Sequence, residues 1–384
     1  MGTGSDTGQN ERVTYLDHAA STPVRAEAVA AMLPFLTERY GNPSGAHAMA
    51  RDARNVLDDA RATLADALGC QPGEIVFTSG GTEADNAAVF SYADRGPVVC
   101  SAIEHHAVLD PVHRVGGRVV DVLPSGELDI DALATTLDDS VSLVSVMLAN
   151  NEIGTVQPLA EIAEIVRARA PHAVFHTDAV QAFPWLDVSA LTAPADLVSI
   201  SAHKFGGPKG VGVLVVRDGV AFNPRQVGGG QERERRSGTQ NVAGIVAMTE
   251  AARLTVEERK TVVDRVTPLR DRLADGLLTS VPGTFETGSR ERKIAGNCHV
   301  CFDGIESEAL LFLLEQHDLM ASAAASCASG AQDPSHVLAA LGVPRERAQG
   351  SLRLSLGVTT TEDDIDLALA VIPPAVARLR ERGS

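Results

Sequence analysis

The chain has 384 residues, 44% of them hydrophobic, and this length and composition indicate a globular protein with two domains or with one large and one small domain. Its formal net charge is −17 at pH 7, so we expect no surface that binds the backbone of a nucleic acid directly. Because no apolar run approaches the roughly 18 residues that a bilayer requires, we expect no membrane segment.

The cysteines and the opening residues bear on the cellular compartment. There are five cysteines, an odd number spread from Cys70 to Cys327, which is typical of a reducing compartment rather than of a disulfide framework. The opening sequence MGTGSDTGQNERV is polar and lacks the basic-then-apolar order of a signal peptide. We therefore expect a cytoplasmic protein in which residues 1–12 form a disordered tail.

From residue 13 onward, helical and strand patterns alternate along the chain. RDARNVLDDARATLADALG (51–69) has helical apolar spacing and a closing glycine, and EIVFTSGG (74–81) is a short strand that runs into a glycine turn. Further strand-like apolar runs lie in residues 96–109, 117–125, 141–150, 172–180, 195–202 and 210–217. This rhythm predicts the α/β class with a mainly parallel sheet.

The pattern changes near residue 250. A long helical region (244–278) leads to the strand-like NCHVCF (297–302), another helix and the strand-like SLRLSLG (351–357). We expect a large domain of residues 20–260 and a smaller α+β domain made of residues 13–19 and 261–384. NCHVCF contains two cysteines and a histidine, but it alternates as a strand does and no second ligand pair with suitable spacing follows, so we expect no metal site.

Two of the chain's four lysines, Lys204 and Lys209, lie together in SISAHKFGGPKG (199–210), just after a strand-like run. A guanidinium stays protonated, whereas a lysine amine can be deprotonated by its surroundings and attack a carbonyl. A lysine nucleophile is therefore one interpretation. A codon preference for arginine, with two chance lysines, is the other.

SGGTEADN (79–86) lies between a strand and a helix. Backbone N–H groups at the start of the helix, together with the hydroxyl of Thr82, can form a phosphate cradle. The motif is neither G-x-G-x-x-G nor a P-loop. An ordinary glycine turn with a threonine cap is the alternative.

Two more polar motifs follow apolar runs. HTDAVQ (176–181) places Asp178 and Gln181 at a strand end, where ligands bind in open α/β sheets. IEHHAVL (103–109) places His105 at another predicted strand end. A helix-capping aspartate and a structural histidine are the alternatives at these two places.

These residue types together match the needs of pyridoxal 5′-phosphate. The aldehyde of this cofactor is held by a lysine, its ring nitrogen is kept protonated by a carboxylate, and its ring acts as an electron sink. A phosphate cradle and a flat imidazole complete the set. The sequence therefore predicts a pyridoxal-phosphate enzyme.

Ten motifs also follow one another in the order found in the class V aminotransferase-fold cysteine desulfurases of the NifS/IscS type: YLDHAASTPV, YGNPSGAH, SGGTEADN, EHHAVL, NNEIGTVQP, HTDAVQ, SAHKFGGPKG, GGGQERERRSGT, SCASG and RLSLG. The chain resembles this family from about residue 13 to its C-terminal helix. The resemblance implies the type I fold of pyridoxal-phosphate-dependent transferases. It also implies conversion of L-cysteine to L-alanine, with the sulfur passing to an active-site cysteine as a persulfide and then to an acceptor protein.

The resemblance implies a role for each matching residue. Lys204 would bind the cofactor covalently, His105 would stack on its ring and take part in proton transfer, and Cys327 would attack the substrate sulfur. Asn151 and Arg353 would hold the substrate carboxylate. The implied cofactor-binding set is Gly81, Thr82, Asn151, Asp178, Gln181, Ser201, His203, Lys204 and Thr239.

Within the cofactor-binding set, Asp178 would pair with the ring nitrogen and Gln181 would bind the 3-oxygen of the ring. The residues that would hold the phosphate are Gly81, Thr82, Ser201 and His203. Thr239 would reach the phosphate of a neighbouring subunit, which implies a homodimer with composite sites.

The segment around Cys327 (319–338) is rich in Ala, Ser and Gly, so we expect a flexible loop that carries a reactive thiol. Cys70 and Cys100 are expected to be inert buried thiols. Family members commonly carry Gly-Ser-Ala just before the cysteine, and Ala324-Ala325-Ser326 stands here instead, a difference that would stiffen the loop.

Two other functions remain open at this stage. One is another class V enzyme, such as an aminotransferase, an epimerase or a selenocysteine lyase. The other is a catalytically silent sulfur-relay scaffold, against which the presence of Lys204 and Asp178 argues. The sulfur acceptor is also open: an iron–sulfur scaffold, a nucleic-acid-thiolating enzyme or a biosynthetic carrier protein.

Overall fold

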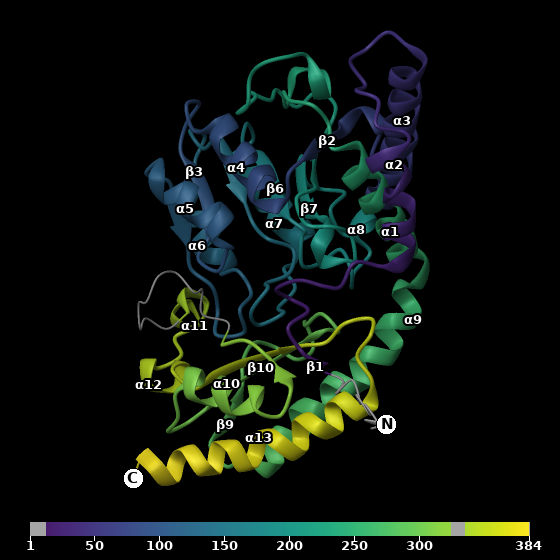
Figure 1. Cartoon of the computed structure of the whole chain (residues 1–384). Helices are drawn as coiled ribbons and strands as arrows, with labels where there is room; N and C mark the ends of the chain where they lie inside the picture. Colours follow the sequence, from purple (N-terminus) through teal and green to yellow (C-terminus); the bar gives the residue numbers. More distant parts are fainter. Residues whose placement is uncertain (1–12, 324–334, 384) are drawn as a thin grey trace, which may run out of the picture.

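The structure is a computed structural model that describes residues 13–323 and 335–383 (Figure 1). The tail expected at residues 1–12 lies outside the described residues. So does the segment 324–334, which includes Cys327 and the run Ala324-Ala325-Ser326. None of the described helices combines the length and the apolar character needed to cross a bilayer.

The upper part of the molecule in Figure 1 is built on a seven-stranded sheet with the order β2-β8-β7-β6-β5-β3-β4. Its strands are β2 (Ile75–Thr78), β3 (Val98–Ser101), β4 (Arg118–Val120), β5 (Leu143–Ser145), β6 (Val174–Asp178), β7 (Leu197–Ser201) and β8 (Gly212–Val216). Strands β4, β3, β5, β6 and β7 pair in parallel, whereas β8 is antiparallel to both of its neighbours. The predicted α/β class with a mainly parallel sheet is confirmed.

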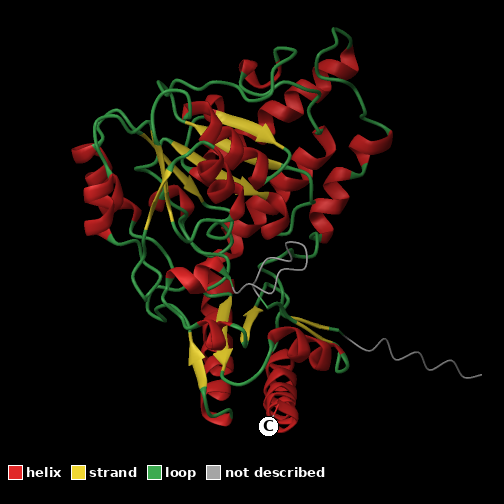
Figure 2. Cartoon of the chain, turned by 90° about the vertical axis from the view of Figure 1, so that its left-hand side faces the viewer, coloured by secondary structure: helices red, strands yellow, loops and turns green. Residues whose placement is uncertain are grey.

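Helices cover both faces of this sheet, as Figure 2 shows. They are α1 (Ala26–Met32), α2 (Pro34–Thr37), α3 (Ala48–Leu68), α4 (Gly81–Tyr92), α5 (His106–Arg114), α6 (Ile130–Thr136), α7 (Leu159–Arg169) and α8 (Val188–Leu191). The helix predicted at 51–69 corresponds to α3. It ends at Gly69, which has a left-handed backbone (φ 63°) that glycine adopts without the steric cost of a Cβ.

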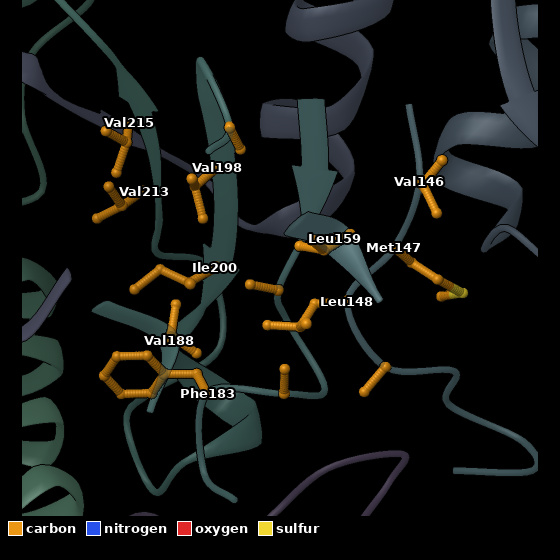
Figure 3. Close-up of a cluster of buried hydrophobic side chains, with 14 of the residues drawn as sticks. Val146, Met147, Leu148, Leu159, Phe183, Val188, Val198, Ile200, Val213 and Val215 are labelled. Atoms are coloured by element: carbon orange, nitrogen blue, oxygen red, sulfur yellow. The ribbon is translucent and has the colours of Figure 1, made fainter. Parts of the chain in front are cut away.

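The side chains of successive strand residues alternate between the two faces of the sheet. On one face, Val198 and Ile200 of β7 and Val213 and Val215 of β8 pack with the residues around Phe183 (Figure 3). On the other face, residues such as Leu197, Leu214 and Val216 pack against α4 and α5. The two cores hold the sheet rigidly, so its strand ends form a fixed edge.

The lower part of the molecule is a smaller α+β unit. Its antiparallel sheet has the order β12-β10-β9, and a parallel pair joins β1 to β11. Its elements are β1 (Thr14–Tyr15), β9 (Thr284–Glu286), β10 (Asn297–Phe302), α10 (Ser307–Glu315), β11 (Leu319–Met320), α11 (His336–Ala340), α12 (Arg345–Ala348), β12 (Ser351–Ser355) and α13 (Glu362–Gly383). NCHVCF is the strand β10, and all of its residues are buried.

The long helix α9 (Val242–Ser280) connects the two parts (Figure 1). Its first half, including Ile245 and Met248, belongs to the core of the large sheet. Its second half, including Val266 and Leu273, belongs to the core of the smaller unit. The domain boundary expected at residue 260 therefore falls inside a continuous helix.

Candidate active site

A cavity of about 500 Å³ lies at the carboxyl edge of the large sheet, where the smaller unit meets it. Most of the predicted site residues line this main cavity: Gly81, Thr82, His105, Asn151, Asp178, Gln181, Ser201, His203, Lys204 and Arg353. The carboxyl ends of parallel strands meet at one edge of a sheet, and this brings residues from distant motifs together.

Lys204 closes a short 3₁₀ turn (Ala202–Lys204) directly after β7. Its Nζ donates to the carbonyl oxygens of Ala19 at 2.6 Å and Ala20 at 3.0 Å. Burial, with a smaller contribution from the Arg353 guanidinium, lowers the pKa of Lys204 to about 8. A substantial fraction of this amine is therefore neutral and nucleophilic near pH 8. Lys209, by contrast, is exposed.

Asp178 is the last residue of β6 and is buried. Its Oδ1 accepts the backbone N–H of Val180 at 2.8 Å, and burial raises its pKa to about 6. Asp85, from α4, lines the same cavity, and burial together with the Asp178 charge raises the pKa of Asp85 well above its usual range. Two buried carboxyls that share a cavity favour a cationic partner there, such as a protonated ring nitrogen.

His105 caps the N-terminus of α5, where its Nδ1 accepts the backbone N–H of Ala107 at 3.0 Å. The ring is exposed in the main cavity, and desolvation by the surrounding protein lowers its pKa to about 4, with the charge of Lys204 acting in the same direction. The ring is therefore neutral and carries its proton on Nε2. The structural interpretation of His105 as a cap and its position in the lining of the main cavity are compatible, and its role in proton transfer stays a prediction.

The turn between β2 and α4 provides a second, adjoining cavity of about 310 Å³. Its lining includes Ser79, Gly80, Gly81, Thr82, Ser201, His203 and Lys209. Gly81 begins α4, so its free backbone N–H and the positive end of the helix dipole favour an anion. A Cβ at Gly81 would lie 2.9 Å from Cγ2 of Val180, so a larger residue here would force the Val180 side chain to shift.

The donor set of this adjoining cavity fits a phosphate. It combines backbone N–H groups, the hydroxyls of Thr82 and Ser201, and the exposed cation of Lys209. The main cavity next to it contributes an amine, a carboxylate and a flat imidazole. The residues present therefore fit the phosphate, the aldehyde and the ring of pyridoxal phosphate.

Arg353, on β12 of the smaller unit, is buried and reaches into the main cavity. Its Nη2 donates to Oδ1 of Asp17 at 2.8 Å, and its Nη1 donates to the carbonyl oxygen of Asn151 at 3.2 Å. Its Nε is buried and has no hydrogen-bond partner among the described residues. A buried guanidinium with an unused donor is suited to binding a carboxylate.

Two predicted site residues do not appear at the cavity within the described chain. Thr239 is exposed and lines neither cavity, so its expected role in a neighbouring subunit stays a prediction. Cys327 lies outside the described residues. Of the described residues that flank its segment, Ser322 and His336 both line the main cavity.

Further residues of the main cavity were missed by the sequence analysis. His106 and His336 meet edge to face, with ring centroids 4.8 Å apart, and Nδ1 of His106 lies 3.0 Å from Oδ1 of Asp110. Glu152 is buried, accepts a hydrogen bond from the Ser335 hydroxyl, and has a pKa raised by burial to about 7. The second histidine of EHHAVL was the available signal for His106, since it follows the predicted strand end.

Comparisons with known proteins show the family to which the chain belongs. Residues 14–368 match the family described as aminotransferase class-V. The chain is 44% identical to a cysteine desulfurase IscS of Methanosarcina thermophila, over 98% of this chain and 95% of the relative. It is 42% identical to an IscS-like cysteine desulfurase of Mycobacterium tuberculosis, over 96% of this chain and 97% of the relative.

Solved structures are similar over almost the whole fold. A NifS-like protein superposes with a TM-score of 0.89 and 36% identity, covering 96% of this chain and 100% of that one. A structure described as SspA in complex with cysteine has a TM-score of 0.75 and 30% identity, covering 90% of this chain and 99% of that one.

Proposed function

Because the chain belongs to the class-V aminotransferase family and is a cysteine desulfurase of the IscS type, we propose that it takes sulfur from L-cysteine in the main cavity with pyridoxal phosphate as its cofactor. L-Alanine leaves, and the sulfur passes through Cys327 to an acceptor protein. The observation that supports this most is the convergence of Lys204, Asp178 and His105 from three strand ends on one cavity, beside an anion cradle.

We assign the cofactor contacts to residues of both cavities. Lys204 holds the aldehyde, Asp178 pairs with the ring nitrogen, and Gln181 binds the 3-oxygen of the ring. The phosphate contacts come from Gly81, Thr82, Ser201 and His203, and from Thr239 of a second subunit. When bound, pyridoxal phosphate supplies an electron sink that stabilises negative charge at the α-carbon of the substrate.

The substrate carboxylate is assigned to Arg353 and Asn151. The Arg353 guanidinium offers a charged donor edge that Asp17 orients at 2.8 Å. The solved structure described as SspA in complex with cysteine supports cysteine as the ligand of this fold. Lys204, with its pKa near 8, is suited to taking the α-proton of the substrate, because its neutral form is populated near neutral pH.

Sulfur transfer is assigned to the Cys327 thiolate. It attacks the sulfur of the substrate, so that an S–S bond forms as the C–S bond breaks. The electron pair of the C–S bond stays with the β-carbon side of the substrate, which takes up a proton on the way to alanine. His105 and Lys204 are the cavity groups placed to carry that proton. The other described cysteines are less suitable nucleophiles, because burial raises the pKa of Cys298 and Cys301 to about 12 and also raises that of Cys100.

The test is a product balance on the purified holoenzyme. With L-cysteine and a thiol reductant, we expect alanine and sulfide in equal amounts, and no products from the apoprotein until pyridoxal phosphate is added. Transfer of the amino group from L-cysteine or L-alanine to a 2-oxo acid, without release of sulfide, would instead support the aminotransferase alternative. Capture of proteins that accept labelled sulfur would identify the acceptor.

A further inference from the structure

A third cavity, which we call the rear cavity, lies between the large sheet and the smaller unit and has a volume of about 260 Å³. Trp185 and Phe205 line it from the large unit, Ile294 and Leu356 line it from the smaller unit, and Val262 lines it from α9. This apolar lining differs from that of the main cavity, which is rich in charged and polar groups. The rear cavity therefore has a different ligand preference from the cysteine site.

The rear cavity adjoins the active site without being part of it. Ala19, Gln181 and Lys204 contribute to the linings of both cavities. The carbonyl oxygen of Ala19 accepts hydrogen bonds from Nζ of Lys204 at 2.6 Å and from Nε2 of Gln181 at 2.7 Å. One segment of backbone thus separates the two cavities.

Arg259 of α9 gives the rear cavity an unusual charged group. Its Nε and Nη2 are buried, and neither has a hydrogen-bond partner in the parts of the chain that the structure describes. These two N–H groups form one edge of the guanidinium, the edge that binds a carboxylate through two parallel hydrogen bonds. Its Cζ lies 5.6 Å from the ring centroid of Phe183, so the apolar wall begins beside the charge.

The other charged groups of the rear cavity have partners. Nη1 of Arg25 pairs with Oε2 of Glu258 at 2.7 Å, and Lys204 donates to the two carbonyl oxygens of Ala19 and Ala20. Burial lowers the pKa of Arg259, and the charge of Asp187 raises it. Asp187 precedes α8 and does not line the rear cavity. An anion that enters the cavity would therefore gain the most binding free energy at the guanidinium edge of Arg259.

Two buried acceptor atoms belong to the same lining. Nδ1 of His18 and Oδ1 of Asn297 have no hydrogen-bond partner among the described residues, and the two side chains are only 6% and 1% exposed. Nδ2 of Asn297 donates to the carbonyl oxygen of Glu152 at 2.9 Å, which fixes the amide with Oδ1 as its unused atom. A ligand that carries an N–H or O–H group in addition to a carboxylate would satisfy Oδ1 of Asn297.

We propose that the rear cavity is a binding site for a small organic carboxylic acid with an apolar body. The carboxylate binds the Nε–Nη2 edge of Arg259, and the apolar body packs between Trp185 and the residues of the smaller unit. The cavity is smaller than the ~300–1,000 Å³ of typical sites for drug-sized ligands, which restricts the apolar body of the ligand to about the size of one aromatic ring. This site is independent of the assignments made for the cysteine reaction.

Trp185 makes this proposal directly testable, because it is the only tryptophan of the chain and it lines the rear cavity. Phenylacetate is titrated into the holoenzyme while tryptophan emission is recorded, and phenylacetamide, which has the same shape and no charge, is the control ligand. We expect a saturable change with phenylacetate and at least tenfold weaker binding of phenylacetamide.

Variants on the same helix locate the binding group. Arg259→Gln is expected to weaken phenylacetate binding at least tenfold while cysteine turnover persists. Arg253→Gln removes an exposed arginine that pairs with Glu250, and it should leave binding unchanged. Arg259→Lys keeps the charge but lacks the two-pronged edge, so it should bind more weakly than wild type, and it serves as the test if the glutamine variant does not fold.

Three results would overturn the proposal. The first is the absence of saturable binding of phenylacetate at millimolar concentration. The second is equal binding to wild type and to both Arg259 variants. The third is a crystal of the holoenzyme soaked in phenylacetate that shows the carboxylate on Arg353 and not on Arg259.

Discussion

Nζ of Lys204 donates to the carbonyl oxygen of Ala19 at 2.6 Å, although 185 positions separate the two residues in the sequence. The same short segment supplies Asp17, which binds Arg353 from the smaller unit. The chain between β1 and α1 therefore forms a wall of the active site and connects its proposed cofactor lysine to its proposed substrate arginine. A small displacement of this wall would move both groups together.

The first prediction concerns the two lysines of SISAHKFGGPKG. Lys204→Ala should abolish the visible absorbance of lysine-bound cofactor and reduce turnover by several orders of magnitude, because the partly neutral amine is lost. Lys209→Ala is the matched control, since Lys209 is exposed and reaches only the anion cradle. It should keep the absorbance and lose cofactor affinity at most severalfold. Absorbance spectra of the two variants decide the assignment, and the reverse result would exclude Lys204.

A second prediction links function to stability at Asp178. Its pKa is raised by burial to about 6, so the folded apoprotein binds a proton here more tightly than the unfolded chain does. The stability that this proton provides is complete below about pH 3.9 and is lost as the pH rises through about 6. Asp178→Asn avoids this loss, so its apoprotein should be more stable than wild type at pH 8 by about 1–3 kcal/mol.

The same substitution should reduce cysteine turnover by roughly 100-fold or more, because a neutral amide cannot hold the ring nitrogen protonated. Urea unfolding at pH 4 and pH 8, together with steady-state kinetics, measures both effects. Asp139→Asn, an exposed change away from both cavities of the active site, is the control for both. Wild-type turnover in Asp178→Asn would remove the aspartate from the proposed mechanism.

The strand-end residues could be predicted from the sequence because each stands in a contiguous motif. Asp178 and Lys204 directly follow apolar runs that are long enough to be recognised as strands, and parallel pairing brings such ends to one edge. The antiparallel strand β8 also follows from a local feature. Only the short stretch 202–211 separates it from β7, and a parallel connection needs a crossover of a dozen or more residues.

Contacts between distant residues could not be predicted in this way. Asp17 and Arg353 are 336 positions apart, and Glu152 and Ser335 are 183 apart, so no local pattern joins them. Likewise, only tertiary packing buries Nε and Nη2 of Arg259 without a hydrogen-bond partner among the described residues. Asp85 is an intermediate case, because it lies four residues after Gly81 and therefore on the same face of α4, a spacing that would have placed it near Gly81 in the main cavity.

The third prediction concerns acid sensitivity. His176 is fully buried between the hydroxyls of Ser145 and Ser199, and burial lowers its pKa to about 3. The unfolded chain protonates this histidine near pH 6.5 and the folded one does not, so stability is complete above about pH 6.5 and is lost as the pH falls toward 3. The loss amounts to about 1.4 kcal/mol per pH unit for each such histidine.

His176→Gln keeps hydrogen-bonding capacity without a titratable ring. Its free energy of unfolding should therefore fall less steeply than that of wild type between pH 6 and pH 4. The difference in slope should correspond to about one proton, or about 1.4 kcal/mol per pH unit. His172→Gln alters an exposed histidine four residues earlier and should retain the wild-type slope. Denaturant unfolding at several pH values measures the slopes. Parallel slopes for wild type and His176→Gln would show that another group dominates acid unfolding.

The fourth prediction tests the composite site through subunit mixing. Thr239→Val should weaken cofactor binding roughly tenfold or more, by removing a hydrogen bond to a charged group in the neighbouring site. A hybrid dimer of Lys204→Ala and Thr239→Val subunits contains one site with both residues intact. Mixing the two poorly active variants should therefore restore up to half of the wild-type activity per hybrid. No recovery in hybrids that analytical ultracentrifugation shows to be dimers would contradict the shared site.

The last prediction concerns Cys327. If its thiolate takes the sulfur as proposed, Cys327→Ser should fold, bind pyridoxal phosphate and bind L-cysteine, yet release essentially no alanine, because a hydroxyl cannot accept sulfur as a persulfide. Cys70→Ser is the control. Burial raises the pKa of the Cys70 thiol to about 12, so this variant should turn over like wild type.

In wild-type protein treated with L-cysteine and no acceptor, mass spectrometry should find one additional sulfur, about 32 mass units, on the peptide that contains Cys327. That sulfur on a peptide with Cys100, Cys298 or Cys301, or normal alanine release by Cys327→Ser, would assign the sulfur-accepting role to a different residue and reopen the aminotransferase alternative.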